Sequence, residues 1–95
     1  MPDHDPLAPA PKRGSLLDED ALRAAAAEAV KAARVTQARV AELVAERIED
    51  RDRPPSPSAI SNAVRETGPK VAALQLDIVR ALTGATFSKA LYRVE

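Results

Sequence analysis

Residues 56–67 read Ser-Pro-Ser-Ala-Ile-Ser-Asn-Ala-Val-Arg-Glu-Thr, and the remaining chain is best understood as the support for this stretch. The order predicts a short helix, because Ser56 can cap the free N–H groups and Pro57 suits the first helical turn. Three apolar residues lie on one side: Ile60, Ala63 and Val64. The other side carries short polar side chains and one arginine: Ser58, Ser61, Asn62 and Arg65. Such a surface suits an approach to the edges of DNA bases, although Ser and Asn are also common on exposed helix starts.

The composition predicts an all-α fold. The chain has 95 residues with one Phe, one Tyr and no Trp, so its core must be aliphatic, with closely packed alanines. Prolines crowd near the start and around residues 53–57, which leaves long proline-free stretches rich in Ala, Leu, Val, Arg and Glu. We therefore expect one small bundle of four to five helices.

Residues 1–14 are rich in proline, and Leu7 is their main large apolar side chain. A segment of this kind buries too little surface to order itself, which predicts a flexible tail at 1–14 followed by one helix-turn-helix domain at 15–95. His4 lies in this tail, and no cysteine or second histidine exists to complete a metal or catalytic site with it.

The charge balance argues against nonspecific attraction to nucleic acid, because fourteen basic residues match fourteen acidic ones. Residues 54–95 keep a small basic excess, with five basic residues against three acidic ones. The absence of cysteine fits a reducing compartment. No apolar run approaches the roughly 20 residues that a membrane span needs, so we expect a cytoplasmic protein with no membrane partner.

Two helices are predicted on either side of the central region. The first spans about 19–34, with Asp18 as its cap and Leu17 packing onto Leu22. The other starts at Pro69 and ends at Thr83 and Gly84. Its main apolar face is formed by Val71, Leu74, Ile78 and Leu82. Leu76 and Val79 begin a second face, which either packs on the C-terminal segment or forms a subunit interface.

A further helix is predicted after Thr36, a plausible N-cap, and is expected to extend to about Asp50 before a charged turn. Its inner face is Val40, Leu43 or Val44, and Ile48. The C-terminal segment 86–95 has spacing that fits either a helix or a short strand. Its two aromatic residues favour core or dimer packing over base stacking.

Two motifs resemble the helix-turn-helix of lambda-repressor-like and Cro-like transcriptional regulators. The first is Thr-Gln-x-x-Val-Ala-Glu-Leu at 36–43, and the second is Ser-x-Ser-Ala-Ile-Ser-Asn-Ala-Val-Arg at 56–65. The resemblance covers roughly residues 22–84 and implies that the helix at about 57–67 lies in the major groove. The two motif helices of the family are joined by a turn of about three to four residues, whereas residues 45–55 intervene here.

Individual residues are predicted to contact DNA, some from the resemblance and others, such as Arg53, from the charged segment that departs from it. Base contacts fall on Pro57, Ser58, Ser61, Asn62 and Arg65. Backbone contacts fall on Thr36, Gln37, Arg39, Ser56, Arg53 and Lys70. Arg47 and Arg51 are further candidates for phosphate contacts, but acidic residues alternate with them, as in a self-paired solvated surface.

These residues predict a repressor-like, sequence-specific regulator that binds double-stranded operator DNA as a homodimer, without a cofactor. Two alternatives remain: an antitoxin-like adaptor with a protein partner, and a helical protein-interaction module with no DNA role. An enzyme is not expected, because the sequence offers no Gly-rich phosphate loop and no nucleophile–base pair. No catalytic or metal-binding residue is predicted.

Overall fold

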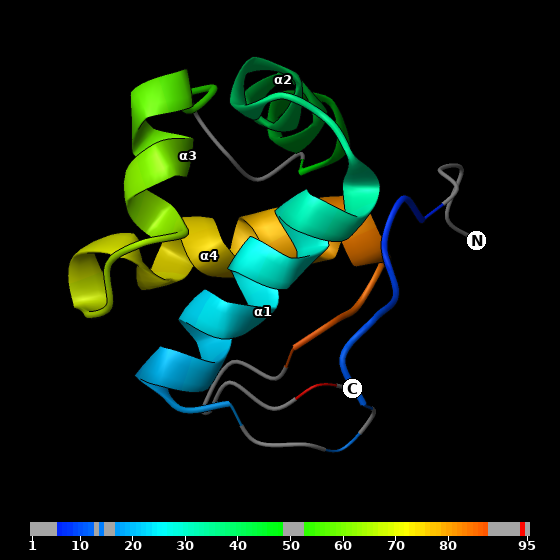
Figure 1. Cartoon of the computed structure of the whole chain (residues 1–95), viewed down its shortest axis with the longest axis vertical. Helices are drawn as coiled ribbons and strands as arrows, with labels where there is room; N and C mark the ends of the chain where they lie inside the picture. Colours follow the sequence, from blue (N-terminus) through cyan, green and yellow to red (C-terminus); the bar gives the residue numbers. More distant parts are fainter. Residues whose placement is uncertain (1–5, 13, 15–16, 49–52, 88–93, 95) are drawn as a thin grey trace.

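The computed structural model describes residues 6–12, 14, 17–48, 53–87 and 94. Four helices form the fold, in the order α1 (Glu19–Ala33), α2 (Gln37–Arg47), α3 (Pro57–Ala63) and α4 (Pro69–Thr83). No strand is formed by the described residues, and the predicted all-α bundle is confirmed (Figure 1).

The predicted helix starts are confirmed by their caps. The side chain of Asp18 accepts a hydrogen bond from the backbone N–H of Ala21 at 2.7 Å and caps α1. Thr36 and Ser56 cap α2 and α3 in the same way, with donor–acceptor distances of 3.1 Å in both. Gly84 ends α4 in the left-handed conformation, with φ of 76°, which glycine adopts without steric cost.

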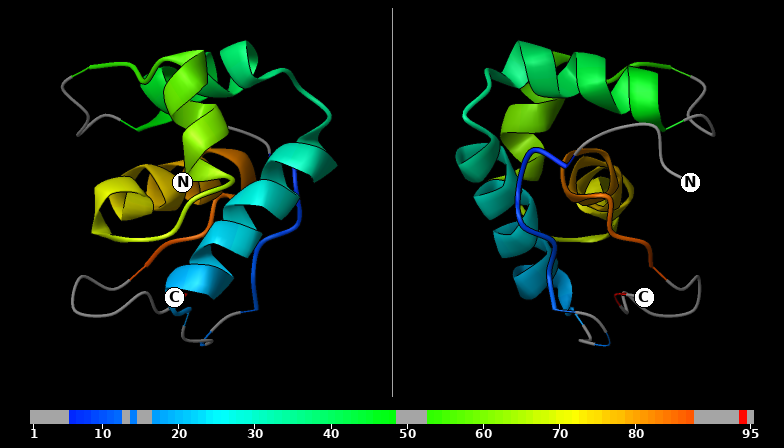
Figure 2. Two further views of the ribbon diagram at one scale, coloured as in Figure 1. Left: turned by 60° about the vertical axis from the view of Figure 1, so that its left-hand side comes forward. Right: turned by 90° about the vertical axis from the view of Figure 1, so that its right-hand side faces the viewer.

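The core lies between all four helices. The most extensive contact joins α1 and α4, and Ala26 and Ala29 of α1 are buried there among the aliphatic side chains. Small side chains at such positions let two helices approach closely. Figure 2 shows α2 and α3 on a second side of α4, next to the side that α1 covers. The largest fully buried side chains are Leu22, Leu43, Ile60, Ile78, Leu82, Gln75, Val40, Val44 and Val79.

Two helices end earlier than predicted. The extension of α2 to about residue 50 is wrong, because α2 ends at Arg47 and Ile48 has an extended backbone with φ of −107° and ψ of 95°. Ile48 is still buried, so the backbone leaves the helix while the side chain stays in the core. Similarly, α3 ends at Ala63 with Val64 as its C-cap, and does not reach residue 67.

The N-terminal segment 6–12 differs from the flexible tail that we expected for 1–14. The backbone N–H groups of Leu7 and Ala8 donate to the carbonyl of Leu82 at 2.7 and 3.1 Å, and Ala8 is buried. Because Leu82 is in the last turn of α4, its carbonyl has no donor within the helix. The N-terminal segment supplies that donor, and this is the physical reason for its packing.

The C-terminal segment contributes one isolated antiparallel bridge between Phe87 and Val94. Val94 is buried and its carbonyl accepts a hydrogen bond from the backbone N–H of Gly14 at 2.6 Å. Phe87 packs against the core, as we predicted for an aromatic residue of this segment. The choice between helix and strand over 86–95 falls mostly outside the described residues, as do Tyr92 and His4.

Candidate nucleic-acid interface

The two faces of α3 divide as the sequence predicts except at Val64, which is only half-buried and follows the helix as its C-cap. Ile60 and Ala63 are fully buried in the core. Pro57, Ser58 and Asn62 are exposed on the other side. Ser61 is half-buried, so it presents less of its hydroxyl than we expected. The exposed side of α3 is therefore a short row of small side chains with little bulk to keep a ligand away.

The starts of α2 and α3 are both exposed, and their hydroxyls are already engaged. The hydroxyl oxygen of Thr36 accepts from the N–H of Arg39, and that of Ser56 accepts from the N–H of Ala59. Each hydroxyl keeps its own O–H donor for a further partner. Gln37, the first residue of α2, is exposed beside Thr36.

Arg39 is paired within its own helix. Its guanidinium lies 3.3 Å from a carboxylate oxygen of Glu42 and 3.6 Å from one of Glu46. All three side chains are exposed, and such pairs contribute little stability. Two carboxylates nevertheless offset the positive charge that a phosphate group would meet at this position.

Arg65 lies beyond the end of α3 and folds back over it. Its Nε donates to the carbonyl of Ser61 and its Nη2 donates to Oδ1 of Asn62, both at 3.2 Å. Asn62 thus has its acceptor oxygen engaged and its amide N–H groups available. A bidentate contact with adenine uses both the oxygen and the nitrogen of an Asn amide, so the oxygen must accept from adenine beside Arg65 or Arg65 must move away.

The remaining predicted contacts fall into two groups. Arg53 and Lys70 are exposed, in the connector before α3 and at the start of α4. Arg47, by contrast, points inward and donates from Nη1 to the carbonyl of Ala81 at 2.9 Å. It helps to cap the end of α4, so its assignment as a phosphate contact is wrong. Arg51 lies outside the described residues.

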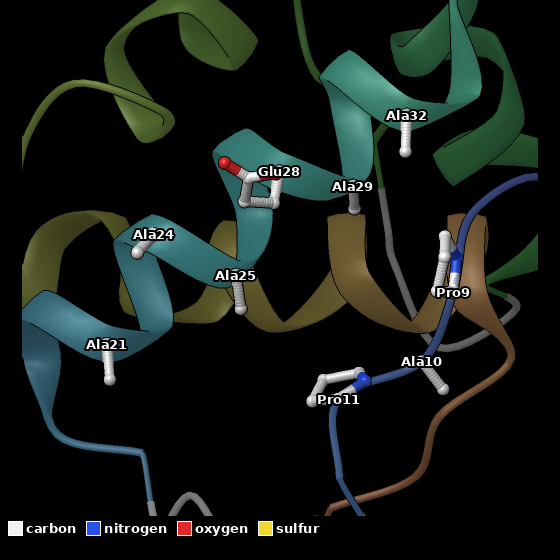
Figure 3. Close-up of a pocket in the computed structure, with 9 residues that line it drawn as sticks. All are labelled: Pro9, Ala10, Pro11, Ala21, Ala24, Ala25, Glu28, Ala29 and Ala32. Atoms are coloured by element: carbon white, nitrogen blue, oxygen red, sulfur yellow. The ribbon is translucent and has the colours of Figure 1, made fainter.

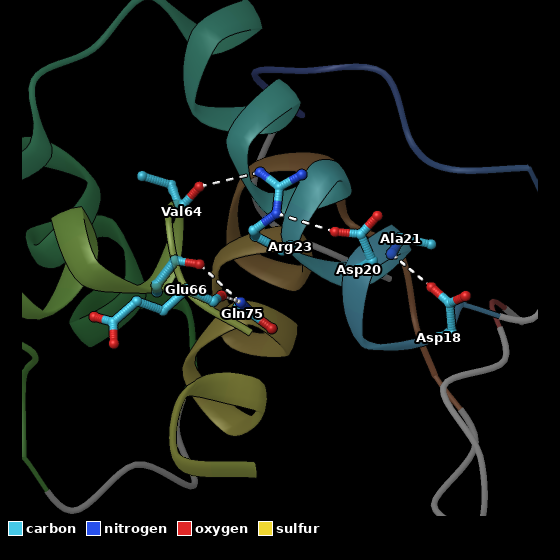
Figure 4. Close-up of polar contacts among 8 residues, drawn as sticks. Asp18, Asp20, Ala21, Arg23, Val64, Glu66 and Gln75 are labelled. Atoms are coloured by element: carbon cyan, nitrogen blue, oxygen red, sulfur yellow. Dashed lines mark hydrogen bonds and ion pairs between the residues drawn. The ribbon is translucent and has the colours of Figure 1, made fainter. Parts of the chain in front are cut away.

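Two residues that we did not predict hold the C-terminal end of α3. Gln75 of α4 is only 1% exposed, and its Nε2 donates to the carbonyls of Ala63 at 2.8 Å and of Glu66 at 2.7 Å. Arg23 of α1 donates to the carbonyl of Val64 at 3.5 Å (Figure 4). These carbonyls have no donor within α3, so α1 and α4 supply the missing hydrogen bonds. The sequence signal was a glutamine inside the apolar stretch of α4.

The described residues contain no group of three or more His, Cys, Asp or Glu side chains that could hold a metal ion. Among the helices described, none has the length and apolar character to cross a membrane. Comparisons with models of known protein families, with curated proteins and with solved structures gave no match.

Proposed function

We propose that this protein is a sequence-specific DNA-binding regulator of transcription, repressor-like and cytoplasmic, which binds its operator as a homodimer. The observation that supports this proposal best is the construction of α3. Its apolar side is buried, its outer side carries small polar side chains and a proline, with Arg65 folded back against Ser61 and Asn62, and its far end is hydrogen-bonded to α1 and α4. A rigidly held helix of this kind suits a major groove.

In this proposal α3 lies with its exposed side against the base edges. Ser58 and Asn62 would exchange hydrogen bonds with bases, Ser61 would reach one through its half-exposed hydroxyl, and Pro57 would contact a thymine methyl group. Arg65 would leave Asn62 and bind a flanking guanine or the backbone. Two protomers would place their α3 helices in major grooves about one helical turn apart.

The backbone contacts would come mainly from uncharged groups. Thr36, Gln37 and Ser56 can donate hydrogen bonds to phosphate oxygens at the starts of α2 and α3. The charged residues proposed for backbone contacts are Arg39, Arg53 and Lys70, and Arg39 already contacts two carboxylates. Because few counterions would be released, we expect the affinity to fall less steeply with salt than for a strongly basic protein.

The test is selection of a binding site from a pool of random duplex DNA, followed by fluorescence anisotropy with the selected and a scrambled duplex at two salt concentrations. Enrichment of one site with a higher affinity than the scrambled duplex supports the proposal. A folded protein that enriches no sequence at micromolar concentration and low salt would contradict it.

Replacing Asn62 by alanine should weaken binding to the selected duplex by about 1 to 3 kcal/mol, because a base contact of the major groove is lost. Binding to the scrambled duplex should stay the same. Gln37→Ala is the matched comparison, because loss of a phosphate contact should weaken both duplexes equally. Circular dichroism checks that both variants keep their helices. Equal losses for Asn62→Ala on the two duplexes would remove Asn62 from base recognition.

The charge distribution favours a second candidate, a helical protein-interaction module or an antitoxin-like adaptor. The net charge is zero, and the exposed arginine of α2 is paired with carboxylates of its own helix. For an interaction module we expect no site to emerge from the random pool. For an antitoxin-like adaptor we expect a site to emerge and a second protein to co-purify with the chain.

A further inference from the structure

An apolar groove of about 400 Å³ lies between α1 and the N-terminal segment (Figure 3). Pro9 and Pro11 form one wall. The wall on α1 is made of alanines and one acidic residue: Ala21, Ala24, Ala25, Glu28, Ala29 and Ala32. Single residues or adjacent pairs of this set recur every three or four positions, so the set shares one side of the helix. A wall of alanines lets the backbone of another helix come close, provided that the approaching surface is also small.

The α1 side of this groove is complementary to itself when a second α1 runs in the opposite direction. If the two-fold axis passes between Ala26 and Ala27, Ala21 meets Ala32 of the partner subunit, and Ala25 meets Glu28 of the partner subunit. Every residue of the α1 wall then faces another residue of the same wall. This is the condition for an isologous interface, in which the same patch is used on both subunits.

The charges beside the groove select this antiparallel arrangement. Asp20 and Lys31 are both exposed and lie about three turns apart on the same edge of α1. The two-fold axis brings Asp20 close to Lys31 of the partner subunit, and this pairing occurs twice. Asp20 also lies 3.5 Å from the guanidinium of Arg23 in its own helix, but its side chain is 82% exposed and can meet a second cation. A parallel arrangement would instead place like charges side by side at both ends. Antiparallel helices also bring opposite ends of their dipoles together.

We infer that the α1 groove is the interface with a second copy of this chain, in an antiparallel two-fold dimer. Glu28 is the one charged residue among those that line the groove. It would lie opposite Ala25 of the partner subunit, and only about 4.5 Å along the helix axis from Glu28 of the partner subunit. Like charges at that position weaken the dimer, so we expect association at micromolar concentration. This interface would form the homodimer that the proposed function requires, and in that respect it rests on the proposed function. The test of the interface itself needs no DNA.

The chain has no cysteine, which makes disulfide cross-linking a specific test of the register. Ala21→Cys and Ala32→Cys proteins, mixed and oxidised, should form a mixed disulfide dimer, because these positions meet across the axis. Ala21→Cys alone should form little, because its two copies would lie about 16 Å apart along the helix axis at a rise of 1.5 Å per residue. Cross-linking of Ala21→Cys alone to the same extent as the mixture would overturn the register.

Light scattering over a range of protein concentrations measures dimerisation and tests the proposed pairing of Asp20 with Lys31 of the partner subunit. Lys31→Glu should weaken dimerisation about tenfold, because two attractive pairs become repulsive, and the added change Asp20→Lys should restore it. Glu28→Ala should strengthen dimerisation and serves as the second variant. If both the natural chain and Glu28→Ala remain monomeric at millimolar concentration, the inference is wrong. A dimer without DNA binding contradicts the proposed function only. Sequence-specific DNA binding by a monomer contradicts the interface and the homodimeric mode of binding, but leaves the DNA-binding function itself in place.

Discussion

The variant Ile60→Ala is expected to lose about 2 to 5 kcal/mol in free energy of unfolding, the largest effect of any substitution in α3. Ile60 is fully buried, and the other side chains by which α3 contacts the core are the small ones of Ala63 and Ala59. Alanine would leave a cavity between α3 and its neighbours, because a helix held by hydrogen bonds from α1 and α4 cannot easily move to fill it. Domains of this size have total stabilities of about 5 to 15 kcal/mol, so the loss is a large share.

Urea denaturation followed by circular dichroism measures this loss. Ile60→Val is the matched control, since it removes one methylene group and should cost about 0.5 to 1.5 kcal/mol. At temperatures where Ile60→Ala is still folded, it should also bind the selected duplex less tightly than Ile60→Val. If the alanine variant is as stable as the valine variant, α3 is held mainly by its hydrogen bonds and not by Ile60.

The second large effect is expected for Gln75→Leu, with a loss of about 1 to 3 kcal/mol in the free energy of unfolding. Leucine fills a similar volume but cannot donate to the carbonyls of Ala63 and Glu66, which would then lack a partner at the end of α3. One gain offsets part of the loss: Oε1 of Gln75 is buried and has no hydrogen-bond partner among the described residues, and leucine removes it.

Gln37→Leu is the control for this substitution, because the same chemical change at an exposed position should alter stability by no more than about 0.5 kcal/mol. Gln75→Glu separates donation from packing. It has almost the shape of glutamine, but a carboxylate cannot donate to a carbonyl and carries a charge into the core. We therefore expect Gln75→Glu to be less stable than Gln75→Leu. Equal stability of Gln75→Glu and the natural chain would mean that Gln75 acts through packing alone.

Local sequence signals predicted the fold well. Asp18, Thr36 and Ser56 cap the helices as expected, and Gly84 ends α4. Each of these roles depends on residues within one turn, which a single sequence displays. The inner face of α2 was equally clear, because its aliphatic residues recur at helical spacing and all are buried.

The features that the sequence did not predict depend on residues far apart in the chain. The end of α3 is set by Gln75 and Arg23, which lie 12 and 41 residues from their main-chain partners Ala63 and Val64. Arg47 looked like a surface cation until the structure placed it against the carbonyl of Ala81, 34 residues away. Helical spacing does not indicate which side chain contacts a main-chain carbonyl so far away in the sequence. An arginine among acidic residues is therefore predicted to be solvated.

The contacts made by exposed side chains were also beyond prediction from the sequence. Arg39 and Arg65 were both assigned to DNA by resemblance, yet in the structure one pairs with Glu42 and Glu46 and the other with Asn62. Exposed ion pairs and hydrogen bonds contribute little free energy, so a bound ligand can replace these pairs. Whether it does depends on the contacts that the ligand offers in exchange. The position of α3 is therefore more predictable than the bases it would read.

The hydrogen bonds from Leu7 and Ala8 to Leu82 have a consequence for the order in which the molecule assembles. During synthesis, Leu7 and Ala8 are made before α4, so their hydrogen bonds to Leu82 cannot form until α4 has been synthesised. Closing so long a loop is entropically costly, so this contact is expected to form after the helices have collapsed. Interactions absent from the folding transition state act mainly on the unfolding rate. Contacts of the N-terminal segment would thus slow unfolding and lengthen the lifetime of the native state, while they change the folding rate little.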